Sequence, residues 1–310
     1  MAKPVNDGTV GDYAAEARAP LTNRAYQSDW LNFERWCDQE GRRPFPASDE
    51  TIAAYIAARA RSGRVDIATI KRNLTSIRHY HKAAGLSQAG RSRLVADTTR
   101  GIERLTRKTD ERKSPLLVAD VRAMCQHLPG PDPMEIRDRA IILITFAAAL
   151  ERLEVAALDV ADLGFLGKGM IVTTRNLRRS QHRGTAKIRV ISGESLVVCP
   201  VRTMGAHLYA AGIKSGPVFR RERDGGRMSP RALAERVKSA AMAIGKDPAT
   251  VGAASLRRGF AISALEGGAP PEVVARHARL ASVGSLNRWL GYGSWPYNDT
   301  ERLASTYLGL

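Results

Sequence analysis

The sequence has few cysteines and no long apolar run, and each shortage excludes a class of protein. The three cysteines, Cys37, Cys125 and Cys199, lie far apart, and neither they nor the six histidines show the spacing of a metal site. We therefore expect no structural metal, no cofactor and a reducing, cytoplasmic compartment. The longest apolar run, Ala140 to Leu150, is far below the ~20 residues that cross a bilayer, so it predicts a core helix and no membrane partner. Residues 1–19 contain no signal segment, and we interpret them as a loose tail.

Acidic side chains are scarce relative to basic ones. The chain has 48 Lys and Arg against 31 Asp and Glu, which gives a formal net charge of +17 and a pI of about 10.3. Because clustered basic side chains attract phosphates whatever the nucleotide sequence, this balance favours a nucleic acid over a small-molecule substrate. A ribosome-associated or merely very soluble basic protein is the alternative that composition leaves open.

The first third of the chain carries helical patterns and no strand pattern. Apolar residues recur at helical spacing, and they predict helices over residues 21–40, 48–63, 66–84 and 94–105. Thr22 and Ser48 are the expected N-caps of the first two helices. We predict an all-helical domain over residues 20–105, a basic linker over 106–115 and a second domain over 116–310.

The third of these helices has a polar-basic face opposite its apolar one. Lys71, Thr75, Arg78 and Lys82 follow one another at spacings of three or four residues, Arg72 adjoins them, and no acid occurs between Ile67 and Gly85. Such a face could lie along a DNA groove or simply be solvated, and composition alone does not decide between the two.

Residues 116–310 combine helical patterns with two β-branched segments. Helices are expected over residues 119–128, 137–150, 200–211, 229–244 and from Ala254 onward, and strands over 170–174 and 186–191. The loop between the strands is rich in basic residues and contains no acid. The basic residues of this hairpin are Arg175, Arg178, Arg179, Arg183, Lys187 and Arg189. The pattern predicts a β-hairpin pressed against phosphates, in a fold that is mainly α with a small antiparallel β-sheet.

Two groups of segments carry a family resemblance. In the second domain they are Arg137 to Leu150, Glu151 to Leu158, Ala253 to Phe260, Gly268-Ala269 and Ser285 to Leu290; in the first they include Ala25-Tyr26, Trp36-Cys37, Pro46-Ala47-Ser48 and His81 to Gly85. In order and residue type they resemble the tyrosine recombinases, the phage integrase family. The resemblance implies a two-domain fold, in which a SAM-like core-binding domain clamps one face of duplex DNA and a catalytic-type domain closes on the other.

The chemistry of that family uses a Tyr hydroxyl that attacks the DNA phosphodiester. Two Arg, one Lys and two His or Trp positions surround the phosphate. In chain order, the matching positions hold Glu151, Arg178, Ala254, Arg257, Leu280 and Trp289. A carboxylate repels phosphate and an indole has no nucleophilic oxygen, so the resemblance leaves Arg257 as the unchanged residue and Arg178 as a conservative exchange. Tyr292, three residues after Trp289, is the candidate for a relocated nucleophile.

From these positions we predict that the chain is not an enzyme and forms no covalent intermediate with DNA. It would be a DNA-binding regulator of transcription, or a non-cleaving partner of an active recombinase on a mobile genetic element. It would be associated with the nucleoid, and a dimer or a tetramer is the assembly that we consider. The alternatives are an active recombinase that uses Tyr292 and a fold relic that serves protein contacts only. Arg257 and Arg258 are expected to contact phosphate, and an ion pair between Arg257 and Glu151 is the alternative for that side chain.

Overall fold

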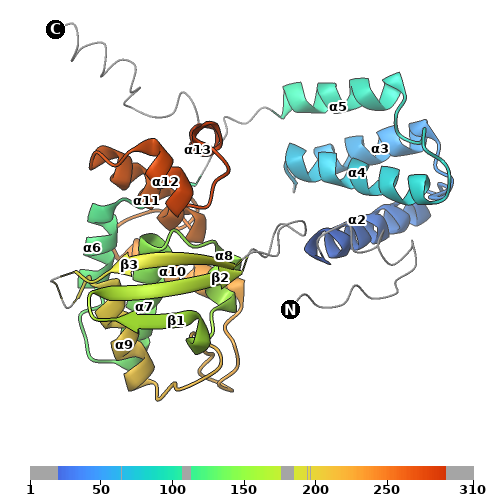
Figure 1. The fold of residues 1–310 in the computed structure, drawn as a ribbon. Helices are drawn as coiled ribbons and strands as arrows, with labels where there is room; N and C mark the ends of the chain where they lie inside the picture. The colour runs from blue at the N-terminus through green and yellow to red at the C-terminus, as the bar shows by residue number, and fades with distance from the viewer. Residues whose placement is uncertain are drawn as a thin grey trace, which may run out of the picture. The chain divides into compact units, whose positions relative to one another are not determined.

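The computed structural model describes residues 20–63, 65–106, 113–175, 185–193, 195 and 197–290. These residues divide into two compact units, which we describe separately (Figure 1). Unit 1 holds the helices up to Leu105, and unit 2 holds the helices and strands from Val118 onward. No helix in the described part of either unit is long and apolar enough to cross a bilayer. The expected tail over 1–19 and residues 107–112 of the expected linker lie outside the described residues.

Unit 1 is helical in its described residues. Its helices are α2 (Pro20–Gln39), α3 (Asp49–Arg61), α4 (Ile67–Ala83) and α5 (Arg93–Leu105). The Ser48 hydroxyl caps α3 as predicted, because it accepts the backbone N–H of Thr51 at 3.2 Å. The predicted N-cap Thr22 is wrong, because α2 begins at Pro20, and proline is well suited to the first helical position.

The core of unit 1 forms where α2, α3 and α4 meet. Its buried apolar side chains include Phe33, Ile52, Ile56, Ile70, Leu74 and Ile77. His81 is fully buried beside them and joins two segments, because its Nε2 accepts the N–H of Ala47 and its Nδ1 donates to the Ile77 carbonyl, each at 2.9 Å. These two bonds use both ring nitrogens of a neutral imidazole, so the histidine is satisfied inside an apolar core.

Unit 2 combines helices with a three-stranded antiparallel sheet. Its helices are α6 (Val118–Gln126), α7 (Pro133–Ala147), α8 (Arg152–Ala157), α9 (Pro200–Ala210), α10 (Pro230–Ala243), α11 (Ala253–Glu266), α12 (Pro271–His277) and α13 (Val283–Leu290), with a 3-10 turn η1 (Val160–Asp162). Its strands, β1 (Leu163–Leu166), β2 (Gly169–Arg175) and β3 (Thr185–Ile191), lie in the order β1-β2-β3. The two predicted strands are present, and the sequence missed β1, which is short and largely exposed.

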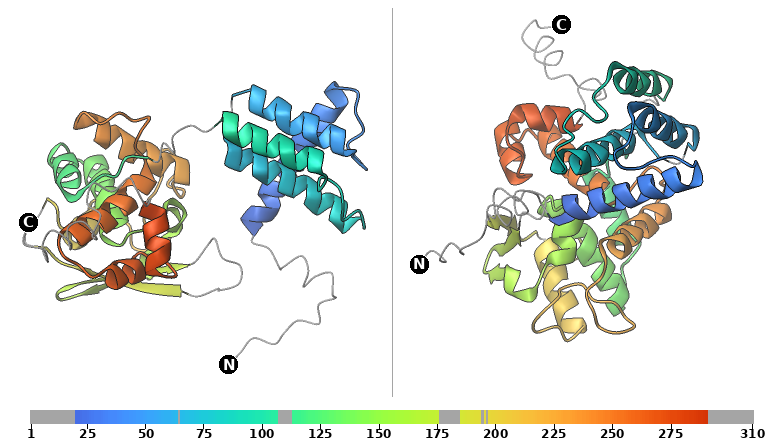
Figure 2. Two further views of the ribbon diagram at one scale, coloured as in Figure 1. Left: turned by 90° about the horizontal axis from the view of Figure 1, so that it is seen from above. Right: turned by 90° about the vertical axis from the view of Figure 1, so that its right-hand side faces the viewer.

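The sheet has one buried and one exposed face. Met170 and Val172 of β2 and Ile188 and Val190 of β3 are buried against the helices, and the sheet lies along the edge of unit 2 in Figure 2. Lys187 and Arg189 alternate with the buried residues and are exposed. The period of two along a strand thus places two basic side chains of β3 on the outer face.

α7 ends three residues earlier than the sequence predicted. It stops at Ala147, and Ala149 adopts the left-handed conformation, with φ of 46°. The N–H of Leu150 then returns to the Thr145 carbonyl at 3.0 Å, a C-terminal turn that closes the helix. The reversal carries Glu151 out of α7 and places it at the N-cap of α8.

α11 approaches the start of unit 2 closely. The N–H of Leu116 donates to the Ser255 carbonyl at 3.0 Å, and a Cβ at Gly259 would lie 1.7 Å from the Leu116 carbonyl oxygen. The absence of a side chain at Gly259 is therefore what allows α11 to pack here. This contact fixes the helix that carries Arg257.

Candidate functional site

The side chain of Arg257 lies where α8, α11, α12 and α13 meet. It is 10% exposed, and its Nη1 donates to the carboxylate of Glu151, which is 26% exposed. Its Nη2 donates to the carbonyl of Ala278, and the ring of Trp289 lies 5.3 Å from the guanidinium carbon. The ion pair that the sequence left as an alternative for Arg257 is therefore present. The guanidinium combines a charge-assisted hydrogen bond with a cation–π contact. We call these four residues the Arg257 pocket.

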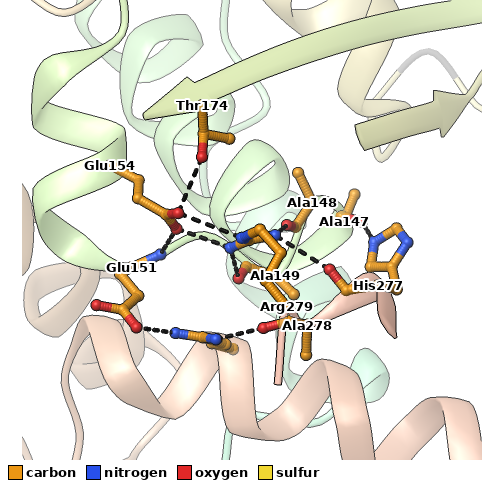
Figure 3. A network of polar contacts seen from close by, with 10 residues as sticks. Ala147, Ala148, Ala149, Glu151, Glu154, Thr174, His277, Ala278 and Arg279 are labelled. Carbon is orange, nitrogen blue, oxygen red and sulfur yellow. Dashed lines mark hydrogen bonds and ion pairs between the residues drawn. The ribbon is translucent and has the colours of Figure 1, made fainter. Parts of the chain in front are cut away.

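A second ion pair, drawn in Figure 3, adjoins the Arg257 pocket. Arg279 donates from Nε and Nη2 to the two carboxylate oxygens of Glu154, at 3.2 and 2.7 Å. Its remaining N–H groups reach the carbonyls of Ala148 at 3.0 Å, His277 at 3.1 Å and Ala149 at 2.7 Å. All five guanidinium donors are thus used within the chain, which leaves none for a ligand.

The Glu154 carboxylate joins this network to the Arg257 pocket. It accepts the Thr174 hydroxyl at 2.9 Å and the backbone N–H of Glu151 at 2.7 Å, in addition to the bonds from Arg279. Burial lowers the pKa of Arg279, and the carboxylate of Glu154 opposes that shift. Glu154 therefore ties β2, α8 and the turn after α12 into one network and holds the backbone of Glu151 in place.

His277 closes the other side of this turn. Its Nε2 donates to the Ala147 carbonyl at 2.9 Å, and its ring stacks on Phe260 with 4.7 Å between the centroids. Burial lowers the pKa of this imidazole, so the neutral form is favoured. No pattern in the sequence predicts a role for His277, Glu154, Thr174 or Arg279. The signal that could have pointed to them is Arg279, since it directly precedes Leu280, which stands at one of the two His or Trp positions of the family.

The structure brings only some of the residues suggested by the family resemblance together. Glu151, Arg257 and Trp289 share the Arg257 pocket, whereas Leu280 packs among apolar side chains of α11 to α13 and Ala254 is exposed on the first turn of α11. Arg258 donates to the Leu290 carbonyl. Four residues of the predicted site lie outside the described part of the chain, namely Arg178, Arg179, Arg183 and Tyr292. The side chain of Arg175 also lies outside it.

The polar-basic face of α4 is engaged by other groups of unit 1. Lys71 pairs with Glu103 of α5 at 2.8 Å, and Arg72 pairs with Asp29 of α2 at 2.7 Å. Arg78 donates to the Gly90 carbonyl at 3.0 Å, and the Thr75 hydroxyl donates to the carbonyl of Lys71 at 2.8 Å. Lys82 is exposed. The acids that the sequence of α4 lacks are thus supplied by other helices: Glu103 is exposed, whereas Asp29 is buried.

Both units match models of known protein families. The family model described as Phage integrase family matches residues 116–289, and that described as Phage integrase, N-terminal SAM-like domain matches residues 13–87. The integrase/recombinase xerD homolog of Selenomonas ruminantium is 28% identical over 287 residues, covering 90% of this chain and 84% of that protein.

Solved structures share the fold. A lambda integrase dimer bound to a COC′ core site has a TM-score of 0.65 at 14% identity, covering 93% of this chain and 76% of that one. The XerH site-specific recombinase, in a post-cleavage complex with palindromic difH substrate, has a TM-score of 0.63 at 13% identity, covering 93% and 80%. The predicted fold class, mainly α with a small antiparallel sheet in two domains, is confirmed.

One functional prediction is wrong. The chain was expected not to be an enzyme, but the relative that it matches over most of its length is an integrase/recombinase homolog, and the matching family model spans the catalytic-type unit. Replacement of motif residues, read from sequence alone, was too weak a ground for that prediction. The positions of Glu151, Ala254, Leu280 and Trp289 stand as observations about the pocket rather than as evidence on activity.

Proposed function

Because the chain belongs to the phage integrase family of tyrosine recombinases, we propose that it is a site-specific DNA recombinase that binds duplex DNA and cuts and rejoins its strands. The observation that carries the proposal is that family models for the N-terminal and the catalytic-type domains both match, in chain order. The resemblance read from the sequence is thereby confirmed. The solved relative from lambda is a dimer on DNA, and we extend dimerisation on DNA and action at the nucleoid to this chain as part of the proposal.

Charge on both units supports the binding of DNA. The formal net charge is +17, and Lys187 and Arg189 are exposed on β3, next to the basic hairpin loop. In unit 1, Lys71 and Glu103 are 48% and 46% exposed, so their ion pair contributes about 0–1 kcal/mol and exchanges readily for a phosphate. The proposed contacts are Lys71, Arg72, Thr75, Arg78 and Lys82 in unit 1, and Arg175, Arg178, Arg179, Arg183, Lys187, Arg257 and Arg258 in unit 2.

The proposed reaction is nucleophilic substitution at a DNA phosphate. The Tyr292 hydroxyl oxygen forms a bond to phosphorus and releases its proton to solvent. The bond from phosphorus to one deoxyribose oxygen breaks, and that oxygen takes up a proton from solvent; the reverse step rejoins a strand. Tyr292 is assigned because it lies three residues after Trp289, whose indole has no nucleophilic oxygen. Arg257 would hold the negative charge of the phosphate.

A nicked suicide substrate tests the cleavage step. The duplex carries a site that the protein selects from random sequence, and a covalent adduct is sought on a denaturing gel. We expect an adduct with the unaltered protein, its loss in Tyr292→Phe, and its persistence in the matched variant Tyr297→Phe. Tight binding without any adduct would refute the cleavage step and leave a role in DNA binding, as a regulator or as a partner in recombination.

The contribution of unit 1 to binding is tested through the salt dependence of the affinity. Replacing Lys71 and Lys82 together by alanine should reduce the slope of log affinity against log salt by roughly one unit for each lost phosphate contact. The matched control replaces Lys168 and Lys214, two exposed lysines of unit 2. An equal change in slope for both pairs would show that only net charge matters and that α4 makes no contact with DNA.

A further inference from the structure

The guanidinium of Arg257 is enclosed on most sides by its own chain. Nη2 donates to the Ala278 carbonyl, Nε is buried, and the Trp289 ring covers one face. Nη1 faces the partly exposed carboxylate of Glu151. A second anion that reaches Nη1 therefore meets the Glu151 carboxylate on the same side.

Glu151 and a phosphate cannot share this position. Both are anions that approach the guanidinium from its Nη1 side, and two like charges a few ångströms apart in a partly buried site repel strongly. Neighbouring cations do not relieve the conflict: Arg279 spends all five donors on Glu154 and three carbonyls. The Glu151 side chain lies at the N-cap of α8 and is 26% exposed, so it borders solvent where it meets Arg257.

We propose that Glu151 competes with DNA phosphate for Arg257 and holds the Arg257 pocket closed until DNA displaces its carboxylate. This inference rests on the proposed function, because it takes phosphate binding at Arg257 as its starting point, and it adds a self-regulating contact to that site. The pocket has a closed form, with Arg257 on Glu151, and an open form, with Arg257 on phosphate. DNA must break the ion pair between Glu151 and Arg257 in order to bind, and the free energy of that ion pair makes the binding free energy for DNA less favourable.

The first test removes the charge of Glu151 and keeps its shape. In Glu151→Gln we expect DNA affinity to rise about 10- to 100-fold, the range that corresponds to a hydrogen bond between charged groups. The matched control is Glu222→Gln, because Glu222 is also an acid of unit 2 and pairs with Arg137 at 2.8 Å. Both variants raise the net charge by one, so only a local effect separates them. Circular dichroism checks that both variants are folded.

The second test asks whether the gain passes through Arg257. In an Arg257→Ala background, Glu151→Gln should change DNA affinity no more than Glu222→Gln does, which makes the effects of the two pocket substitutions non-additive. A gain that survives without Arg257, or no gain of Glu151→Gln over Glu222→Gln, would overturn the proposed competition.

Inorganic phosphate supplies a readout that needs no DNA site. Raising phosphate should increase the melting temperature of Glu151→Gln and leave that of the unaltered protein and of Glu222→Gln unchanged, because a ligand stabilises the folded state that binds it. An equal response in all three proteins would also overturn the competition. If no protein binds DNA but Glu151→Gln alone responds to phosphate, the proposed function fails while the closed pocket stands.

Discussion

Removal of the Arg279 side chain is expected to destabilise unit 2 more than almost any other single substitution near the Arg257 pocket. In Arg279→Ala the Glu154 carboxylate keeps only its bonds from Thr174 and Glu151, and three backbone carbonyls lose a donor. The side chains of Arg279 and Glu154 are only 17% and 10% exposed. Breaking a buried pair by removal of one partner costs about 3–5 kcal/mol, because the remaining charge stays buried.

The backbone conformation at Arg279 makes replacement by glycine less destabilising than replacement by alanine. Its φ is 56°, and a residue with a Cβ in this left-handed region is disfavoured by about 1–2 kcal/mol relative to glycine. Arg279→Gly should therefore be more stable than Arg279→Ala by about 1 kcal/mol, although glycine also gains entropy in the unfolded chain. For a unit of this size, a loss of 3–5 kcal/mol corresponds to a fall in melting temperature of about 6–20 °C.

Urea unfolding and calorimetry measure these differences. Arg152→Ala, which removes an exposed arginine next to Glu151, is the matched control and should lie within about 0.5 kcal/mol of the unaltered protein. The double variant Arg279→Ala with Glu154→Gln should cost less than the sum of the two single changes, because the orphaned charge is gone. A cost below about 1 kcal/mol for Arg279→Ala, or full additivity, would refute the argument.

Two further substitutions test the packing and the pH response of unit 2. Gly259→Ala should lower the free energy of unfolding by at least about 3 kcal/mol, since its Cβ would meet the backbone of Leu116. Gly205→Ala in α9 has open space around its Cβ and should raise the free energy of unfolding by about 0.5–1 kcal/mol. Equal effects of the two substitutions would contradict the close approach at Gly259. His207 donates from Nε2 to the Val218 carbonyl, its buried Nδ1 has no partner among the described residues, and burial lowers its pKa. The neutral His207 contributes fully to the free energy of unfolding above the unfolded pKa of about 6.5, and this contribution is lost as the pH falls toward the lower folded pKa. The free energy of unfolding measured with urea should therefore decrease between pH 7.5 and 5.5. It should decrease less in His207→Gln. An equal drop in both proteins would show that His207 does not titrate this way.

Local patterns in the sequence were enough to locate most of the secondary structure. The apolar spacing of α4, the Ser48 cap and the β-branched segments of β2 and β3 depend on neighbours within a few residues, and the structure agrees with them. The errors fall where a local pattern has no distinct signal. The apolar run to Leu150 looks helical throughout, but the left-handed Ala149 ends α7 early because the chain must turn to place Glu151 at α8.

By itself the sequence determined the fold, the family and the basic character of both units, because these depend on the order and type of residues. Tertiary structure alone decided what the charges do. Glu151 and Arg257 are 106 residues apart and form an ion pair, and Lys71 meets Glu103 of another helix although its own helix carries no acid. Electrostatic energy depends on distance and burial, and neither quantity can be read from separation along the chain.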